Sequence, residues 1–473
     1  MKNSQLTEVL TSLDKAEFKE FGKFARSPYF NNRNEVVRFY DALKKFYPKF
    51  SSKNLREELL FSSVYPKKKY NDVLMRKLVS LLVKHAMNYI AISGFKEAKL
   101  GYEVKLLYKL YDKNLPVMFE KESKSIEELL KNSIHTAEYY EAKFRHTSKL
   151  NAYLISRNEK AAIQEYQKEL DDFIEYFLVV ILILYQRLKT YSNIFNYKYD
   201  LKFFNEVMEF LSKNDYTGTI LVSMYYYMIL LSDMADEKYF FEFISFWEKN
   251  ETRLSDLYQY NIYTSLYNYC LDKVKRGEIK YRKLLFDLSV KLLAKNIIVS
   301  AVGHISTPLF TGIVRNAVYL KEIKWAEEFI TGNKQWLDPA ESDECVEYSL
   351  AMLEFEKENF GKSMEHLSVL NPHKLIMKLN GKNLFIMNLY EMGYSEELLS
   401  AIDAYRHFLH RDKTITQQYI NMNSLFLKYV SELSLLRVNG KNDENHALKK
   451  EIENTPYFTL KEWVVKKAEE LSK

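Results

Sequence analysis

Glycine and proline are scarce in this chain of 473 residues, which holds 12 of the first and 8 of the second. Few of its turns can therefore require the positive φ angles that glycine tolerates best. Long helices joined by short polar segments are the simplest interpretation of this composition. The shortage of glycine also leaves little from which to build a backbone phosphate cradle, and no P-loop, dinucleotide fingerprint or Gly-x-Ser-x-Gly elbow occurs.

Cysteine is scarcer still, because the chain has only Cys270 and Cys345, far apart in sequence. A disulfide framework is not indicated, and a reducing compartment fits. Residues 1–20 lack the apolar segment of a signal peptide. The most apolar run, 177–185, is far shorter than the roughly 20 residues that span a bilayer. We therefore expect a soluble cytoplasmic protein with no membrane partner.

Apolar residues make up 47% of the chain and charged residues 28%, which is typical of a globular protein. The length allows two or three ordinary domains or one long repeat array. Beyond residue 94, apolar residues recur every three or four positions, and no strand alternation interrupts them. The sequence thus predicts an all-α protein, with an irregular break near 299–308. The expected helices cover 95–111, 117–131, 135–156, 158–191, 200–212, 218–234, 238–250, 256–276, 279–295, 307–320 and 324–332.

Residues 1–94 are predicted to form a separate helical module, and residues 95–473 the body. Phenylalanines at 18, 21 and 24, with Phe30 beyond, share the spacing of one helix face. Asp14 and Glu17 fit a capping box that would start this helix, and Pro28 should end it near Arg26. Three more helices are expected over 33–47, over 54–64 and from residue 71 or 72 onward. Asn31 would cap the first of these, and Asn71 or Asp72 the last.

Two turns in this module are distinctive: Ser27-Pro28-Tyr29-Phe30-Asn31, and a turn rich in Tyr and Asn over 65–71 before a leucine-rich helix. Together with the Phe-rich helix, they make roughly the first 90 residues resemble the N-terminal part of a group of uncharacterised bacterial helical proteins. The resemblance implies a helical fold and no particular chemistry. The alternative is that 27–31 only turns the chain between two helices.

The module is also basic. Residues 1–110 hold 22 Lys and Arg against 11 Asp and Glu, a charge of +11, whereas the remainder holds 47 against 52, a charge of −5. A basic head suits an anionic partner or a contact with the acidic body, and the alternative is a set of solvated faces.

The segments 55–64, 65–70 and the helix from 71 could form a helix–turn–helix. Lysine and arginine would then contact phosphates, while polar residues near the helix start reach base edges. Against this interpretation, the turn is long and the second helix is strongly apolar. The candidate nucleic-acid contacts are Lys67, Lys68, Lys69, Arg76 and Lys77.

An internal repeat is visible in the second half. Trp325, Phe360 and Tyr394 each follow a short joint and lie 35 and 34 residues apart, and Tyr239 and Tyr281 fit the same role with spacings of 42 and 44. We expect each aromatic to open the second helix of a pair and to be buried between its two helices. The pattern is similar to tetratricopeptide repeats, most clearly over 304–410.

The match is partial. Ala351 fits the small position where the helices of such a repeat cross, whereas Phe385 stands at the equivalent place in the next repeat, and Gly393 is the one glycine at a joint. An irregular α-solenoid of antiparallel helix pairs is therefore predicted, and the alternative is a bundle in which the spacing is accidental.

Catalytic patterns are weak. His407 and His410 could place two imidazoles on a metal, but a third ligand would be needed, and two surface histidines are the better interpretation. Adjacent carboxylates such as Glu57-Glu58 point in different directions on a helix. We therefore expect no catalytic residue, metal or cofactor. The predicted function is a non-catalytic scaffold that binds a protein or peptide partner, and the alternative is a nucleic-acid-associated protein that uses the basic module.

Overall fold

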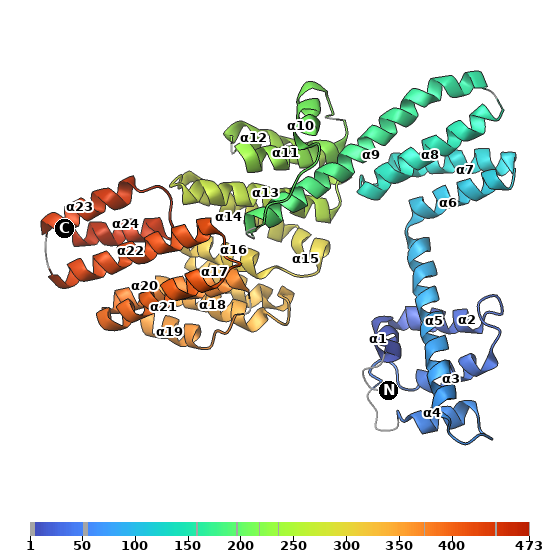
Figure 1. The fold of residues 1–473 in the computed structure, drawn as a ribbon, viewed down its shortest axis with the longest axis horizontal. Coiled ribbons are helices and arrows are strands. Elements are labelled where there is room, and N and C mark those ends of the chain that lie inside the picture. The colour runs from blue at the N-terminus through green and yellow to red at the C-terminus, as the bar shows by residue number, and fades with distance from the viewer. Residues whose placement is uncertain are drawn as a thin grey trace. The chain divides into compact units, whose positions relative to one another are not determined.

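The computed structural model describes residues 5–50, 55–157, 159–194, 197–216, 218–234, 236–372, 374–439 and 442–472. These residues are mostly helical, which confirms the all-α prediction. Their sole strand-like pairing is one bridge between Ile305 and Leu337. The helices are α1 (Gln5–Ser12), α2 (Lys15–Arg26), α3 (Asn34–Lys44), α4 (Glu57–Val64), α5 (Asp72–Glu97), α6 (Lys99–Asp112), α7 (Pro116–Asn132), α8 (Ala137–Ile155), α9 (Glu159–Ile194), α10 (Phe204–Lys213), α11 (Ile220–Met234), α12 (Glu237–Asn250), α13 (Asp256–Lys275), α14 (Lys280–Ala294), α15 (Ile297–Val302), α16 (Thr307–Tyr319), α17 (Ile323–Asn333), α18 (Ser342–Glu356), α19 (Phe360–Ser368), α20 (Leu375–Met392), α21 (Ser395–Arg411), α22 (Gln417–Asn439), α23 (Asn442–Asn454) and α24 (Lys461–Leu471) (Figure 1).

The chain divides into two compact units. The N-terminal unit comprises 1–131 with 145–162, and the C-terminal unit comprises 132–144 with 163–473. The chain therefore passes from one unit to the other three times, at the end of α7 and within α8 and α9. The boundary expected at residue 94 lies inside α5, which continues to Glu97.

Helices α1 to α5 enclose a core of their own in the N-terminal unit. Phe18 and Phe21 of α2 are buried in it, and the hydroxyl of Tyr40 donates to the carbonyl oxygen of Phe18 over 2.8 Å. The long helix α5 contributes Met75, Leu78, Leu82 and Ala86, which lie three or four residues apart on one face. By length and composition, α5 is the one helix of the described residues that could cross a membrane.

The start of α2 matches the sequence prediction. Asp14 Oδ1 accepts from the backbone N–H groups of Ala16 and Glu17, and Glu17 Oε2 accepts from the N–H of Asp14 over 2.8 Å. The capping box is thus confirmed, and so is the end of the helix at Arg26. Asn71 caps α5 as expected, because its Oδ1 accepts from the N–H of Leu74.

Other local predictions were wrong. Asn31 does not cap α3, whose N-cap is Arg33 without a side-chain bond. Instead Asn31 is buried, donates to the carbonyl of Ala25 over 2.7 Å and accepts from the N–H of Arg33 over 2.9 Å, so it fixes the turn. Phe30 is 38% exposed and stacks on the half-buried Phe24, at a centroid distance of 4.1 Å, so the aromatic face leaves the core there.

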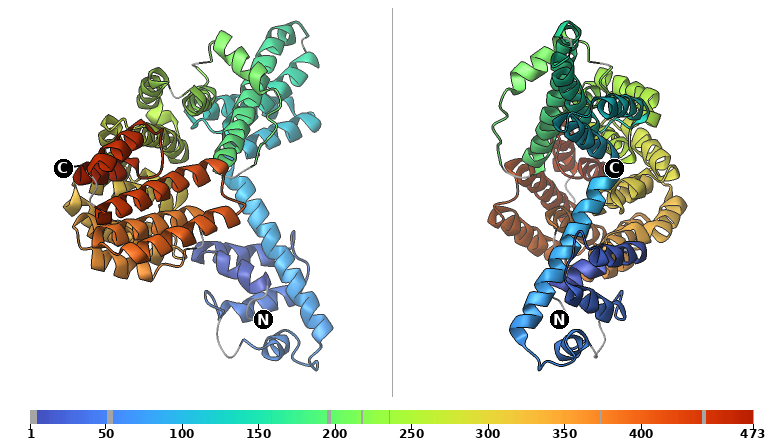
Figure 2. Two further views of the ribbon diagram at one scale, coloured as in Figure 1. Left: turned by 60° about the vertical axis from the view of Figure 1, so that its left-hand side comes forward. Right: turned by 90° about the vertical axis from the view of Figure 1, so that its right-hand side faces the viewer.

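In the C-terminal unit, most helices pack as hairpins. The pairs are α11 with α12, α13 with α14, α16 with α17, α18 with α19, and α20 with α21. The first helix of one pair also packs on that of the next, as α16 does on α18 and α18 on α20 (Figure 2). One core cluster runs through this unit from Tyr140 to Ala468. The helices expected between 117 and 332 are found within four residues of their predicted bounds, whereas the single helix expected over 95–111 is divided at Ala98 between α5 and α6.

Four of these hairpins turn through the same pair of backbone hydrogen bonds, and in α13–α14 the left-handed residue is Gly277, with a φ of 92°. Lys321, Glu358 and Gly393 adopt φ angles of 63°, 62° and 75°, and each stands two residues before its second helix. In each hairpin the N–H of this residue donates to the carbonyl three residues earlier, and the next N–H donates to the carbonyl five residues before it. These bonds satisfy carbonyls that a helix end leaves free. Lysine and glutamate therefore occupy left-handed positions that usually hold glycine.

This motif predicts that substitutions at equivalent positions of two hairpins change the stability of the protein in opposite directions. Gly393→Ala should destabilise the protein by roughly 1–2 kcal/mol, because a side chain disfavours left-handed backbone. A Cβ at Gly393 would meet no atom within 4 Å, so the backbone is the only cost. Glu358→Gly should stabilise by up to about 1 kcal/mol, since it relieves that strain but adds freedom to the unfolded chain. Urea unfolding midpoints that move in the same direction in both variants would contradict the assignment.

Candidate functional site

The basic segment predicted to contact nucleic acid forms the joint between α4 and α5. Lys67, Lys68 and Lys69 are exposed there, and Lys77 is exposed on α5. Within the described residues, none of these four lysines forms an ion pair. Lys68 lies 5.1 Å from the ring centroid of Tyr65. Their charges are therefore open to an anionic partner.

The surroundings of this joint are less favourable to a helix–turn–helix. Arg76 is ion-paired with Asp72, in the first turn of α5. Desolvation, the hydrogen bond to Glu57 and the charges of Glu57, Asp72 and Glu58 raise the pKa of Tyr70, so these carboxylates gather at the start of α5. A recognition helix brings its first turns to the bases, where such carboxylates would meet phosphates. The joint of 65–71 is also longer than the usual three or four residues.

The five repeat aromatics do not share one environment. Tyr281 is completely buried, with ring centroids of Tyr269 and Phe240 at 5.8 and 6.0 Å. Tyr239, Trp325 and Phe360 are half-buried. Tyr394 is 47% exposed, so the expectation that each aromatic is buried was wrong there.

The reason lies in the register of each aromatic to its joint. Trp325 stands four residues after the left-handed Lys321, whereas Phe360 stands two after Glu358 and Tyr394 one after Gly393. Each residue turns a helix by about 100°, so these rings point in different directions. Phe360 packs on Phe355 of its own hairpin, at a centroid distance of 5.4 Å.

Trp325 instead reaches the preceding hairpin. Its ring lies 4.9 Å from that of Phe286 on α14, centroid to centroid. It also stacks on Phe329 of its own helix at 5.3 Å. Trp325 therefore connects successive hairpins.

A groove of about 380 Å³ lies in the C-terminal unit, at the N-terminal ends of α16, α20 and α22. Its walls are mostly apolar and come from Pro308, Ile376, Leu379, Ile415 and Tyr419. Ile376 is 37% exposed although it is a large apolar residue. The groove can therefore accept an apolar side chain from outside.

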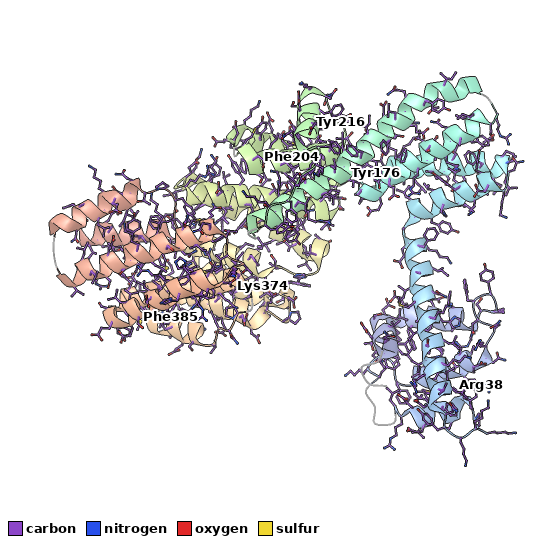
Figure 3. All side chains as sticks on the ribbon, viewed as in Figure 1. Arg38, Tyr176, Phe204, Tyr216, Lys374 and Phe385 are labelled. Carbon is purple, nitrogen blue, oxygen red and sulfur yellow. The ribbon has the colours of Figure 1, made fainter. Side chains whose placement is uncertain are left out.

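The polar rim of the groove is electrically balanced. Thr307 Oγ1 donates to one oxygen of Glu341 over 2.5 Å, and Lys374 Nζ, labelled in Figure 3, pairs with the other over 2.5 Å. Burial would raise the pKa of Glu341, but the bonds from Lys374 and Thr307 outweigh it and lower that pKa. Glu341 thus neutralises Lys374, and the apolar walls are left to determine what binds.

The other candidate groups contribute little to a site. His407 and His410 are both exposed, and His407 Nε2 lies 3.5 Å from Asp403 on the same helix. Burial raises the pKa of Cys270 and of Cys345 to about 12, so both thiols stay protonated. In the part of the chain that the structure describes, no three His, Cys, Asp or Glu residues are grouped to hold a metal ion.

The chain matches no protein-family model, no curated protein sequence and no solved structure. The resemblances to the bacterial helical proteins and to tetratricopeptide repeats therefore stay predictions. Function has to be inferred from the side chains themselves.

Proposed function

We propose that this protein is a non-catalytic helical-repeat scaffold, and that the groove at the ends of α16, α20 and α22 receives apolar side chains of a protein partner. The observation that carries the proposal is the groove itself, which three helices form and which leaves Ile376 exposed. In this proposal the helix pairs of the C-terminal unit form an irregular α-solenoid, and the partner lies across their first helices.

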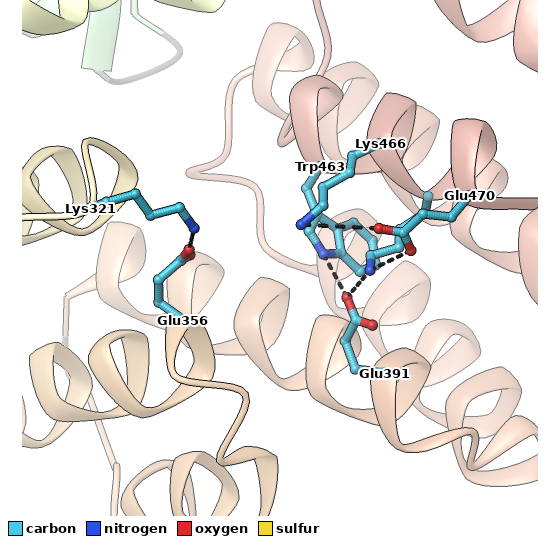
Figure 4. A network of polar contacts seen from close by, with 7 residues as sticks. Lys321, Glu356, Glu391, Trp463, Lys466 and Glu470 are labelled. Atoms are coloured by element: carbon cyan, nitrogen blue, oxygen red, sulfur yellow. Dashed lines mark hydrogen bonds and ion pairs between the residues drawn. The ribbon is translucent and has the colours of Figure 1, made fainter. Parts of the chain in front are cut away.

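Contacts between successive hairpins support the solenoid, because they recur with the spacing of the repeat. In the later hairpins, hydrogen bonds join residues 33 to 35 positions apart, and in the earlier ones 43 or 44 apart. The repeat aromatics show the same change in spacing, from 42 and 44 residues in the earlier hairpins to 35 and 34 in the later ones. The bonded pairs are Glu237 with Lys280 and Tyr281, Arg282 with Asn316, Thr307 with Glu341, Arg315 with Tyr348, and Lys321 with Glu356 (Figure 4 shows the last).

The apolar walls support a protein or peptide partner. Burying one large apolar side chain of a partner contributes about 1.5–3 kcal/mol, so one such anchor at the groove would be a substantial part of a micromolar affinity. The neutralised rim at Glu341 and Lys374 would add orientation more than attraction.

The test compares two equally drastic substitutions. Ile376→Glu places a charge on the groove wall, whereas Val369→Glu places it at an exposed position after α19 that does not line the groove. Affinity capture with the full chain, followed by quantitative mass spectrometry, should recover a partner with the wild type and with Val369→Glu. The amount of this partner recovered with Ile376→Glu should be at least about tenfold lower. Equal recovery by both folded variants, judged by circular dichroism, would rule out the groove.

The exposed lysines of the α4–α5 joint favour a second candidate, nucleic-acid association. Binding of labelled oligonucleotides to the full chain should then fall steeply with salt, because each phosphate contact releases counterions. Reversing Lys67 and Lys68 to Glu should remove that binding, and reversing Lys15 and Lys19 of α2 should not. Fluorescence anisotropy at two salt concentrations measures this binding. If the anisotropy does not rise when the wild type is added, nucleic-acid association is excluded.

A further inference from the structure

The last helix, α24, packs on α22 and α23 and also reaches three earlier helices through polar side chains. We propose that the surface of α14, α16 and α20 that α24 covers is a helix-binding site, with α24 as its resident ligand. A partner helix of the same side-chain chemistry would take its place. This site is distinct from the groove at Ile376 and does not depend on the function proposed there.

The first anchor is an ion pair between residues 180 positions apart. The guanidinium of Arg282 on α14 donates to Glu462 Oε2 over 2.6 Å. The side chains are only 13% and 26% exposed. The guanidinium carbon of Arg282 also lies 3.4 Å from the ring centroid of Tyr319, at the end of α16. Arg282 is thus held between an aromatic ring and one carboxylate, a geometry that suits recognition of a carboxylate.

The second anchor is Glu391, near the end of α20. Its Oε1 accepts from Trp463 Nε1 over 3.0 Å and from Lys467 Nζ over 2.8 Å (Figure 4). The Lys467 side chain is 9% exposed, so this pair is shielded from water. The Trp463 ring lies edge-on to Tyr390 at a centroid distance of 5.3 Å.

These anchors define the chemistry of a competing helix. It would carry a carboxylate, a tryptophan at the next position and a lysine four positions after the tryptophan, as Glu462, Trp463 and Lys467 do. Trp463 and Lys467 are four residues apart and share a helix face, whereas Glu462 lies about 100° around the helix from Trp463. Tryptophan and arginine are the residues that dominate binding energy at protein interfaces.

Two features weaken the docking of α24 on the rest of the C-terminal unit. Leu460 starts α24 with a φ of 58°, a left-handed conformation disfavoured for leucine, and gives no side-chain cap. Before α24, the segment 455–460 is not helical and contains Pro456. The docked state therefore keeps backbone strain at Leu460 that a separate helix would not carry.

The test supplies α24 in trans. The probe is a fluorescent synthetic peptide of residues 455–472, and the full chain is the binding protein. Wild type should bind it weakly, because its own α24 covers the site. The variant Glu462→Arg should bind it roughly a hundredfold more tightly, since removing one member of a buried ion pair strongly weakens the resident contact.

Charge reversal on the other side provides the specificity control. Arg282→Glu should release α24 equally but reject the wild-type peptide, because its carboxylate would face another carboxylate. The same chain should accept a peptide that carries Glu462→Arg. The doubly reversed chain, Arg282→Glu with Glu462→Arg, should close again and bind neither peptide well. Equal binding of the wild-type peptide to all four chains would overturn the site.

Hydrogen exchange on the wild type keeps the proposal testable even if the single variants unfold. Amides of α24 should exchange at least about tenfold faster than buried amides of α20, because α24 detaches without global unfolding. Equal hydrogen-exchange rates would show that α24 is a permanent part of the core and would overturn the proposal that another helix replaces it. Ile376→Glu should leave peptide binding unchanged, so loss of the groove function and loss of this site are distinguished.

Discussion

Replacing Tyr281 by alanine is expected to lower the free energy of unfolding by about 3–5 kcal/mol, the range for removing a large aromatic side chain from a core. Its ring is completely buried against Phe240 and Tyr269, and its hydroxyl donates to Glu237 over 2.8 Å. Tyr281→Phe should cost less, about 1.5–3 kcal/mol, because the ring stays and one hydrogen bond to a carboxylate is lost.

Tyr394→Ala provides the matched control. Tyr394 has the same role in the sequence repeat but is half in solvent, so its loss should cost about 0.5 kcal/mol or less. Urea unfolding followed by circular dichroism measures all three variants. A similar loss at Tyr281 and Tyr394 would mean that the two rings have equivalent environments, contrary to the structure.

Gly22→Ala is expected to destabilise the helices around α2 by about 1–3 kcal/mol, the usual effect of overpacking. A Cβ on Gly22 would lie 2.5 Å from the hydroxyl oxygen of Tyr40 and 2.8 Å from its ring carbon Cζ. Tyr40 cannot withdraw easily, because it is buried and bonded to the carbonyl of Phe18. Gly22 is therefore required by the close approach of α2 and α3.

Gly94→Ala should have the opposite effect. Gly94 lies within α5, and a Cβ there would meet no atom within 4 Å. Alanine should then stabilise the helix by roughly 0.5–1 kcal/mol through its better helix propensity. Thermal unfolding of the two variants tests the pair, and a gain at Gly22 would show that Tyr40 can move aside.

Local signals in the sequence were sufficient for the helices and some of their ends. The capping box of Asp14 and Glu17 and the cap at Asn71 involve residues three apart, so sequence alone determines them. Asn31 was misassigned because its partners, Ala25 and Arg33, are those of a turn, which competes with capping.

The direction of side chains was harder to predict. Trp325 and Tyr394 were aligned by spacing, but a shift of a few residues against the joint turns a ring to another face of its helix. The left-handed residue that sets this register is lysine in one joint and glutamate in another, so no glycine marks it.

The groove was not predicted, because it joins the N-terminal ends of three helices that are far apart in sequence, from residue 307 to residue 419. Its one sequence signal is an apolar residue at the start of a helix, such as Ile376 in the first turn of α20 and Ile415 just before α22. The α24 site could not be predicted from the sequence either, because Arg282 and Glu462 are 180 residues apart.

The bond between Arg282 and Glu462 also sets an order of events during synthesis. The chain emerges from the ribosome N-terminus first, at about 5–20 residues per second, so α14 is complete roughly 10–40 seconds before α24. Until α24 emerges, Arg282 and, once it has been synthesised, Glu391 lack the carboxylate and the lysine that later neutralise them. Docking of α24 thus follows the synthesis of α14 and α20, and a nascent chain arrested between α20 and residue 461 presents both charges to any other helix nearby.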